Sequence, residues 1–206
     1  MIQVRMDELL QGYRRFRNEQ WPERRGVFER LADAGQAPRA MVIACSDSRV
    51  DPTMIFSAEP GKLFVLRNVA NLVPPYAPDS ALHATSAALE FAIRVLEVQD
   101  LIVMGHAMCG GIRVLLHGAP DNAADFLLPW MRIAEPAKRR ALLRPGADVQ
   151  SQCEQESVKL SLENLLTFPW IAQRVREQRV RISGMIFDIR SGVLTLLQPD
   201  GNFEAV

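Results

Sequence analysis

The sequence predicts an α/β domain with a parallel sheet at its centre. Two short apolar runs, residues 40–44 and 101–104, each stop at polar residues and are typical of buried strands. A long helical pattern precedes the second run, and a strand–helix–strand order places parallel strands in one sheet. The last residues form two further strand patterns that meet at Ser191-Gly192, which predicts a hairpin.

Residues 1–35 are expected to form a helical arm ahead of the sheet. Leu9, Tyr13 and Phe16 fall on one face of a first helix. A second helix opens near Pro22, because proline suits the first helical turn. The arm could pack on a partner subunit or on its own domain, and the sequence leaves both alternatives open.

The remaining elements follow in chain order without an internal repeat or linker, so we expect one domain over residues 1–206. They are a strand at 63–66, a loop at 71–79, a long helix at 80–98, short helices and loops over 129–147, and helices at 148–167 and 170–178. In the long helix, Leu82, Leu89, Ile93 and Leu96 share one face.

Composition argues against nucleic-acid and membrane partners and indicates a cellular location. Basic and acidic residues number 24 each, so the basic excess of a nucleic-acid-binding protein is missing and we expect no nucleic-acid partner. No run approaches the length of a membrane span, so we expect no membrane partner. Three cysteines and no apolar leader segment indicate a reducing, cytoplasmic location, where cysteines are metal ligands, catalytic or buried.

Potential metal ligands follow two of the predicted strands. Cys45 ends the first apolar run, and His106 and Cys109 follow the run at 101–104. The carboxyl ends of parallel strands meet at one edge of a sheet, where ligands bind in open α/β folds. Two thiolates and one imidazole suit zinc, and Cys₂His with an open fourth position is a known catalytic zinc set.

Charged and small residues surround these ligands. In an extended chain, Cys45, Asp47 and Arg49 point to one side, so Asp47 is expected within reach of the metal and Arg49 within reach of Asp47. A helix that begins near Gly110 would aim backbone N–H groups at an anion.

An alternative is a nucleophilic Cys45 with His106 as base. A Cys-x₅-Arg phosphate loop needs arginine at position 51, where Asp51 stands, and that scheme leaves Cys109 unused. Cys153 lacks comparable neighbours and is interpreted as structural.

The sequence resembles the β-class carbonic anhydrases, in their plant-like branch, over nearly its whole length. The matching segments are ACSDSRVDP (44–52), LFVLRNVANLVPPY (63–76), AALEFA (87–92), VMGHAMCGGI (103–112), VKLSLENLLTFPWI (158–171) and GMIFDI (184–189). The resemblance implies a mostly parallel sheet with one antiparallel edge strand and flanking helices. It also implies a homodimer, or a dimer of dimers, with the N-terminal helices reaching over a neighbour.

The resemblance also implies a reaction, the zinc-dependent reversible hydration of carbon dioxide to bicarbonate and a proton. Zinc would be held by Cys45, His106 and Cys109, while Asp47 either takes the fourth position or pairs with Arg49. The implied substrate contacts are Gln36, Phe64, Val69, Phe91 and Gly110.

One departure concerns a second, inhibitory bicarbonate pocket in another branch of that family. Val42 and Phe187 replace its tryptophan and tyrosine, although its arginine, Arg67, is present. We therefore expect no second bicarbonate pocket.

Two alternative functions stay open: hydrolysis of carbon disulfide or carbonyl sulfide on the same scaffold, and a catalytically silent zinc protein that binds bicarbonate or a transporter.

Overall fold

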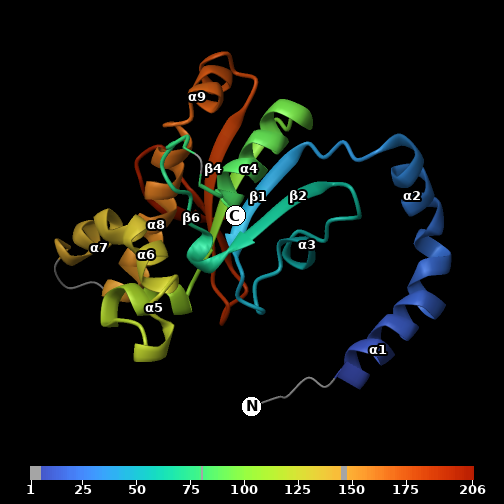
Figure 1. The fold of residues 1–206 in the computed structure, drawn as a ribbon, viewed down its shortest axis with the longest axis horizontal. Helices are drawn as coiled ribbons and strands as arrows, with labels where there is room; N and C mark the ends of the chain where they lie inside the picture. Colours follow the sequence, from blue (N-terminus) through green and yellow to red (C-terminus); the bar gives the residue numbers. More distant parts are fainter. Residues whose placement is uncertain (1–5, 80, 145–147) are drawn as a thin grey trace. The chain divides into compact units, whose positions relative to one another are not determined.

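The computed structural model describes residues 6–79, 81–144 and 148–206, and the chain divides between Ala37 and Pro38 into two compact units. In the smaller unit, helix α1 (Met6–Arg15), a π-helical turn (Phe16–Gln20) and helix α2 (Trp21–Ala34) follow one another directly (Figure 1). Residues 1–5 of the expected arm lie outside the described residues.

Aromatic residues pack together where these helices join. The Trp21 ring lies 5.0 Å from that of Phe28 and 6.3 Å from that of Phe16, and the Arg17 guanidinium lies 5.4 Å from the Trp21 ring centre. None of the residues in α1, the π-helical turn or α2 is fully buried. Whether this apolar face packs on a partner or on the same chain stays a prediction.

The larger unit contains a six-stranded sheet in the order β2-β1-β3-β4-β5-β6, within the described residues. The strands are β1 (Ala40–Cys45), β2 (Leu63–Asn68), β3 (Asp100–His106), β4 (Arg181–Phe187), β5 (Leu194–Leu197) and β6 (Phe203–Ala205). The first four in that order run parallel and the last two are antiparallel to their neighbours. The predicted α/β class with a mostly parallel sheet is confirmed.

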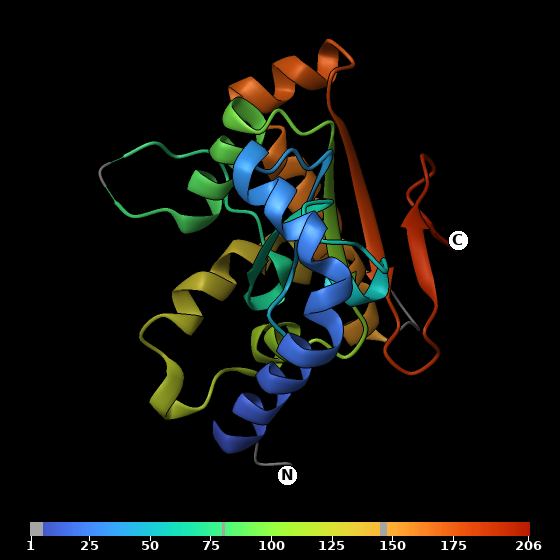
Figure 2. The ribbon, with the colours of Figure 1, turned by 90° about the vertical axis from the view of Figure 1, so that its right-hand side faces the viewer.

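The antiparallel edge has one strand more than expected. The hairpin through Ser191-Gly192 joins β4 to β5 as predicted, and β6 then pairs with β5 (red in Figure 2). Strand β6 has only three residues, which is too few to show an alternating pattern.

Helices pack against the sheet of the larger unit. They are α3 (Pro52–Ile55), α4 (Ala84–Glu90), α5 (Gly110–His117), α6 (Leu127–Met131), α7 (Glu135–Leu142), α8 (Val149–Leu165) and α9 (Pro169–Arg176). Helix α8 packs on β3 and β4. A Cβ at Gly105 or Gly184 would lie 2.6 or 2.8 Å from Val158, so glycine at these strand positions lets α8 approach the sheet closely.

The long helix predicted over 80–98 is shorter than expected. It begins at Ala84 and continues from α4 into a π-helical turn (Phe91–Val95). The Asp79 carboxylate accepts hydrogen bonds from the Ala81 backbone and from the His83 ring, at 2.7 Å each. These local bonds compete with helix formation, so Leu82 lies outside the helix and is fully exposed instead of sharing the buried face with Leu89.

The later helices match the sequence pattern. Asp148 caps α8 by accepting a hydrogen bond from the Gln150 N–H at 3.1 Å, so the helix predicted at 148–167 begins where expected. Short helices occupy most of 129–144, and residues 145–147 lie outside the described part. Among the described residues, no helix combines the length and the apolar character that crossing a membrane requires.

Candidate metal centre

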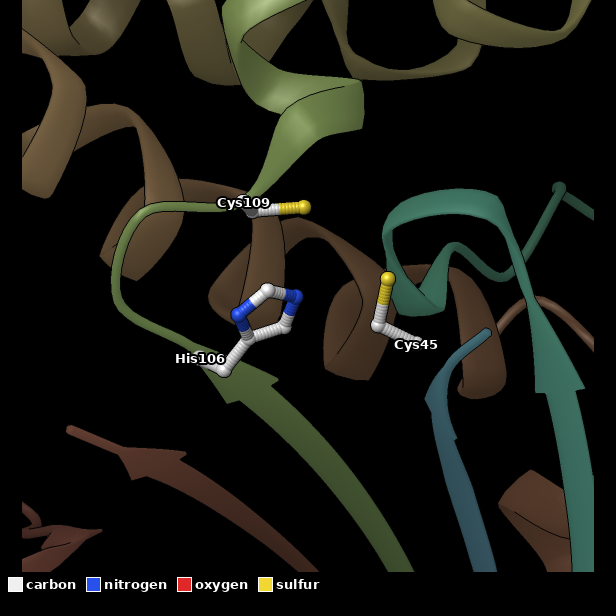
Figure 3. A group of neighbouring side chains, drawn as sticks. All are labelled: Cys45, His106 and Cys109. Carbon is white, nitrogen blue, oxygen red and sulfur yellow. The ribbon is translucent and has the colours of Figure 1, made fainter. Parts of the chain in front are cut away.

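Three potential metal ligands converge at the carboxyl edge of the sheet. Cys45 ends β1, His106 ends the neighbouring strand β3, and Cys109 caps helix α5. Their ligand atoms all lie within 4.8 Å of one another, and all three residues are buried (Figure 3). The crossover from β2 to β3 passes over β1, which brings these distant segments together.

The His106 ring is oriented for metal binding. Its Nδ1 donates a hydrogen bond to the Ala107 carbonyl oxygen at 2.9 Å, which leaves Nε2 as the ring nitrogen available to a metal ion. Nε2 is buried without a hydrogen-bond partner among the described residues, and it faces the space between the two sulfur atoms (Figure 3). An unpaired buried nitrogen is costly, and a zinc ion in this space would satisfy it. The residues present therefore fit zinc.

The two thiols influence one another. A hydrogen bond from the Cys109 thiol lowers the pKa of Cys45 against the effect of burial, and the His106 ring and the N–H groups of Asp47 and Ala70 lower it further. The pKa of Cys109 is raised because it donates that hydrogen bond and is buried beside a negative sulfur. Without a cation the pair thus favours one thiolate, whereas a metal ion favours two.

Asp47 is paired with Arg49 in two-pronged geometry. Arg49 Nε donates to Asp47 Oδ1 at 2.9 Å, and Arg49 Nη2 donates to Oδ2 at 2.7 Å. The Arg49 backbone N–H adds a third bond, to Oδ1, at 3.0 Å. The side-chain bonds to Arg49 hold the pKa of Asp47 well below its usual range. Both carboxylate oxygens are thus engaged by Arg49.

Two polar residues of α8 that were not predicted as part of the site hold Cys109. The Cys109 N–H donates to Glu154 Oε1 at 2.8 Å, and Gln150 Nε2 donates to the Cys109 carbonyl oxygen at 3.1 Å. Gln150 also donates to Glu154 Oε1 at 2.6 Å. Glu154 is only 4% exposed, and burial raises the pKa of its carboxyl. Their spacing of four residues on a helix face was the only available signal.

Two of the predicted substrate contacts, Phe64 and Phe91, lie together in the larger unit. The Phe64 and Phe91 rings stack with centroids 5.8 Å apart. Phe64 lies four residues before Asn68, the register partner of Cys45, which is about 13 Å along a strand. Gln36 belongs to the smaller unit.

Val69 and Gly110 lie closer to the ligands. Gly110 is the first residue of α5, directly after Cys109. Val69 begins the turn beside Gly111, where a Cβ would lie 3.0 Å from Val69 and 2.9 Å from Ala70. Val69 also lines a mainly apolar cavity of about 780 Å³, together with Leu127 and Trp130. The grouping of all five residues into one pocket stays a prediction.

The fold and the site together define a class. An open α/β sheet with a buried Cys₂His cluster at its carboxyl edge, beside a carboxylate–guanidinium pair, is the arrangement of a metal-dependent enzyme.

Comparison with known proteins identifies the family. The carbonic anhydrase family model matches residues 40–194. Beta carbonic anhydrase 3 of Arabidopsis thaliana is 35% identical over 205 residues, which cover 95% of this chain and 78% of that protein. The chain therefore belongs to the carbonic anhydrase family, in its β class, and its enzyme class is carbonate dehydratase.

Solved structures agree with this assignment. The β-carbonic anhydrase CcaA superposes with a TM-score of 0.90 at 33% identity, covering 98% of this chain and 99% of that one. A tetrameric β-carbonic anhydrase of Sordaria macrospora gives a TM-score of 0.69 at 28% identity, covering 97% and 95%. The fold similarity thus extends over nearly the whole chain.

Proposed function

We propose that the chain catalyses the zinc-dependent reversible hydration of carbon dioxide to bicarbonate and a proton. The observation that carries this proposal is the buried cluster of Cys45, His106 and Cys109 beside the Asp47–Arg49 pair. Family membership supports the same reaction.

In this proposal Cys45, His106 and Cys109 hold the zinc. Zinc, when bound, supplies a Lewis acid that makes water nucleophilic near neutral pH. Asp47 is an ionised carboxylate and can only accept hydrogen bonds, so it would orient a water molecule by accepting a hydrogen bond from that water. Arg49 keeps Asp47 ionised and engages both of its carboxylate oxygens, which are bonded to the Arg49 guanidinium or backbone. This supports pairing over metal ligation for Asp47.

We further propose that the substrate pocket needs more than one copy of the chain. The stacked Phe64–Phe91 pair lies about 13 Å along the strand from Cys45, and Phe91 is 42% exposed. A second copy can bring such an apolar surface to the metal centre, alongside Val69, Gly110 and Gln36. The tetrameric relative supports a homodimer or a dimer of dimers.

A cytoplasmic location without nucleic-acid or membrane partners is part of the same proposal. It is supported by the balanced charge and by free cysteines that need a reducing environment to remain metal ligands.

The test is stopped-flow hydration of carbon dioxide by protein of measured zinc content. We expect turnover that scales with zinc occupancy. Sulfide release from carbon disulfide or carbonyl sulfide without carbon dioxide turnover would instead establish the sulfur substrates. A protein fully loaded with zinc that turns over neither substrate class would contradict the enzymatic proposal and favour a silent bicarbonate-binding or transporter-associated role.

A further inference from the structure

Arg67, near the end of β2, makes three hydrogen bonds to the segment that carries Cys45 and Asp47. Its Nε donates to the Cys45 carbonyl oxygen at 2.9 Å, and its Nη2 donates to the Asp47 carbonyl oxygen at 2.6 Å. Its Nη1 donates to Asp51 Oδ2 at 3.2 Å. Each of the three guanidinium nitrogens thus has its own acceptor.

These bonds fix the backbone of the loop that follows β1. The Ser46 N–H bonds to the Asn68 carbonyl oxygen at 2.8 Å, which extends the strand pairing one residue past Cys45. Beyond that point the chain leaves the sheet, and the planar fork of Arg67 spans the turn by binding the carbonyls of Cys45 and Asp47. A lysine cannot reproduce this geometry, because its ammonium is a single point of charge on a flexible stem.

Arg67 is itself anchored to helix α3. Asp51, which accepts from Arg67 through Oδ2, uses Oδ1 to accept from the N–H groups of Thr53 at 2.8 Å and Met54 at 3.3 Å. The helix start, the carboxylate, the guanidinium and the two carbonyls therefore form one continuous chain of bonds. Arg49 holds the Asp47 side chain, and Arg67 holds the Asp47 backbone.

The same contacts argue against an anion-binding role for Arg67. Val42, one of the two neighbours that would complete a bicarbonate pocket, is fully buried in an apolar cluster with Ala44 and Met104. Phe187 packs against a different apolar cluster. Neither side chain offers a hydrogen-bond donor to an anion.

We propose that Arg67 is a positioning residue for the metal centre, holding the Cys45–Asp47 backbone so that the Cys45 sulfur and the Asp47 carboxylate keep their places. This rests on the proposed function for the role of Asp47, whereas the effect on the Cys45 ligand is independent of it. Outer partners of this kind typically change metal affinity or activity by about 10–100-fold when lost.

The experiment compares wild type with Arg67→Lys and Arg67→Gln, each loaded with zinc. The first readout is the rate of zinc transfer to a chromogenic chelator, which we expect to rise about 10–100-fold in both variants. The second is carbon dioxide hydration, where we expect kcat to fall with little change in KM, because all three guanidinium nitrogens of Arg67 are bonded to protein acceptors. The matched control is Arg181→Lys, which removes a two-pronged bond to Asp100 at the opposite end of the sheet and should change neither rate.

Several outcomes would overturn the proposal. Folded Arg67→Lys with wild-type zinc transfer and wild-type kcat would do so. So would unchanged zinc transfer together with loss of a sigmoidal bicarbonate inhibition, because Arg67 would then bind the anion. If the Arg67 variants do not fold, Asp51→Asn, which keeps Arg67 and an N-cap side chain, must show faster zinc transfer than Arg181→Lys. Should the wild type lack hydration activity, zinc transfer still decides the proposal.

Discussion

The two cysteine ligands are held in contrasting ways. On the Cys45 side, the supporting groups are charged and partly exposed. The side chains of Arg49, Arg67 and Asp51 are 49%, 28% and 43% exposed. On the Cys109 side, the support comes from Gln150 and from Glu154, a residue of α8 that is only 4% exposed. One half of the site relies on paired charges near water, and the other on hydrogen bonds away from it.

The two halves of the site should therefore contribute differently to catalytic activity and to the stability of the fold. Charge pairs near solvent are screened and individually contribute little to stability, so the Cys45 half can serve catalysis at small cost to folding. A buried donor that loses its acceptor pays the full desolvation cost, so the Cys109 half is coupled to the stability of the fold. Mutations in the first half should therefore affect activity, and mutations in the second should affect unfolding.

Ligand replacement should give the largest effect and should be the same on both sides. Cys45→Ser or Cys109→Ser removes one of three ligands, so we expect loss of zinc and a fall in activity greater than the ~100-fold typical of outer partners. The measurement is zinc content by atomic absorption together with stopped-flow hydration. Cys153→Ser, a buried free cysteine outside the ligand set, is the control and should keep both. Full zinc retention in Cys45→Ser would contradict the ligand assignment.

Arg49→Ala should separate activity from metal binding on the Cys45 side. Asp47 loses its two-pronged partner and becomes free to bind the metal, so we expect zinc to be retained while activity falls about 10–100-fold. Hydration rates between about pH 6.5 and 9, with zinc content measured for each preparation, provide the check. Arg25→Ala, which removes an exposed pair with Glu29, serves as the control. Near-wild-type activity of Arg49→Ala across that range would show that the pairing does not keep the site open.

Glu154→Ala should show the opposite behaviour on the Cys109 side. The Cys109 N–H loses its buried acceptor, so we expect the free energy of unfolding to fall by about 1–3 kcal/mol. Glu154→Gln keeps an acceptor oxygen and is the matched control, with a smaller loss. Urea denaturation measures both variants. Equal stability of wild type and Glu154→Ala would mean that α8 does not support this ligand.

Asp51→Asn should give the smallest effect and a defined pH dependence. Hydrogen bonds from the Thr53 hydroxyl and nearby N–H groups, together with the Arg67 charge, lower the pKa of Asp51 in the folded state. Ionised Asp51 therefore stabilises the fold above its unfolded pKa of about 3.9, and this contribution is lost as pH falls through the lower folded value. Asparagine preserves the cap of α3, so the variant should lose only about 0.2–1 kcal/mol at pH 7.

The check for Asp51→Asn is urea denaturation at several pH values between 7 and about 3. The stability difference from wild type should shrink as the solution becomes more acidic. A difference that grows towards low pH would reverse the sign of the linkage and contradict the assigned charge pair.

Much of the fold was predictable, because local patterns carry it. The apolar runs at 40–44, 63–66 and 101–104 became β1, β2 and β3, and Asp148 marked the start of α8. The predicted start of the long helix at residue 80 was wrong, because the Asp79 side chain bonds to residues that precede Ala84. Strand β6 was missed because three residues show no periodicity.

Within the site, the residues that follow strand ends were predictable and their supports were not. The strand ends bring Cys45 and His106 to one edge, which a topology rule anticipates. Glu154 and Gln150 reach Cys109 only because α8 packs closely on Gly105, a tertiary contact with no local signature. Arg67 was visible in the sequence, but its three bonds depend on how the loop turns after β1.

The β2-β1-β3 strand order has a kinetic consequence for metal uptake. His106 and Cys109 are three residues apart and can bind an ion together in an unfolded chain, whereas Cys45 joins them only after β1 and β3 have paired. An early-bound ion would have two protein ligands until the slow, non-local part of folding is complete. Because the full ligand set exists only in the native state, bound zinc shifts the equilibrium towards that state by mass action. Tight zinc binding during refolding should thus report the pairing of β1 with β3.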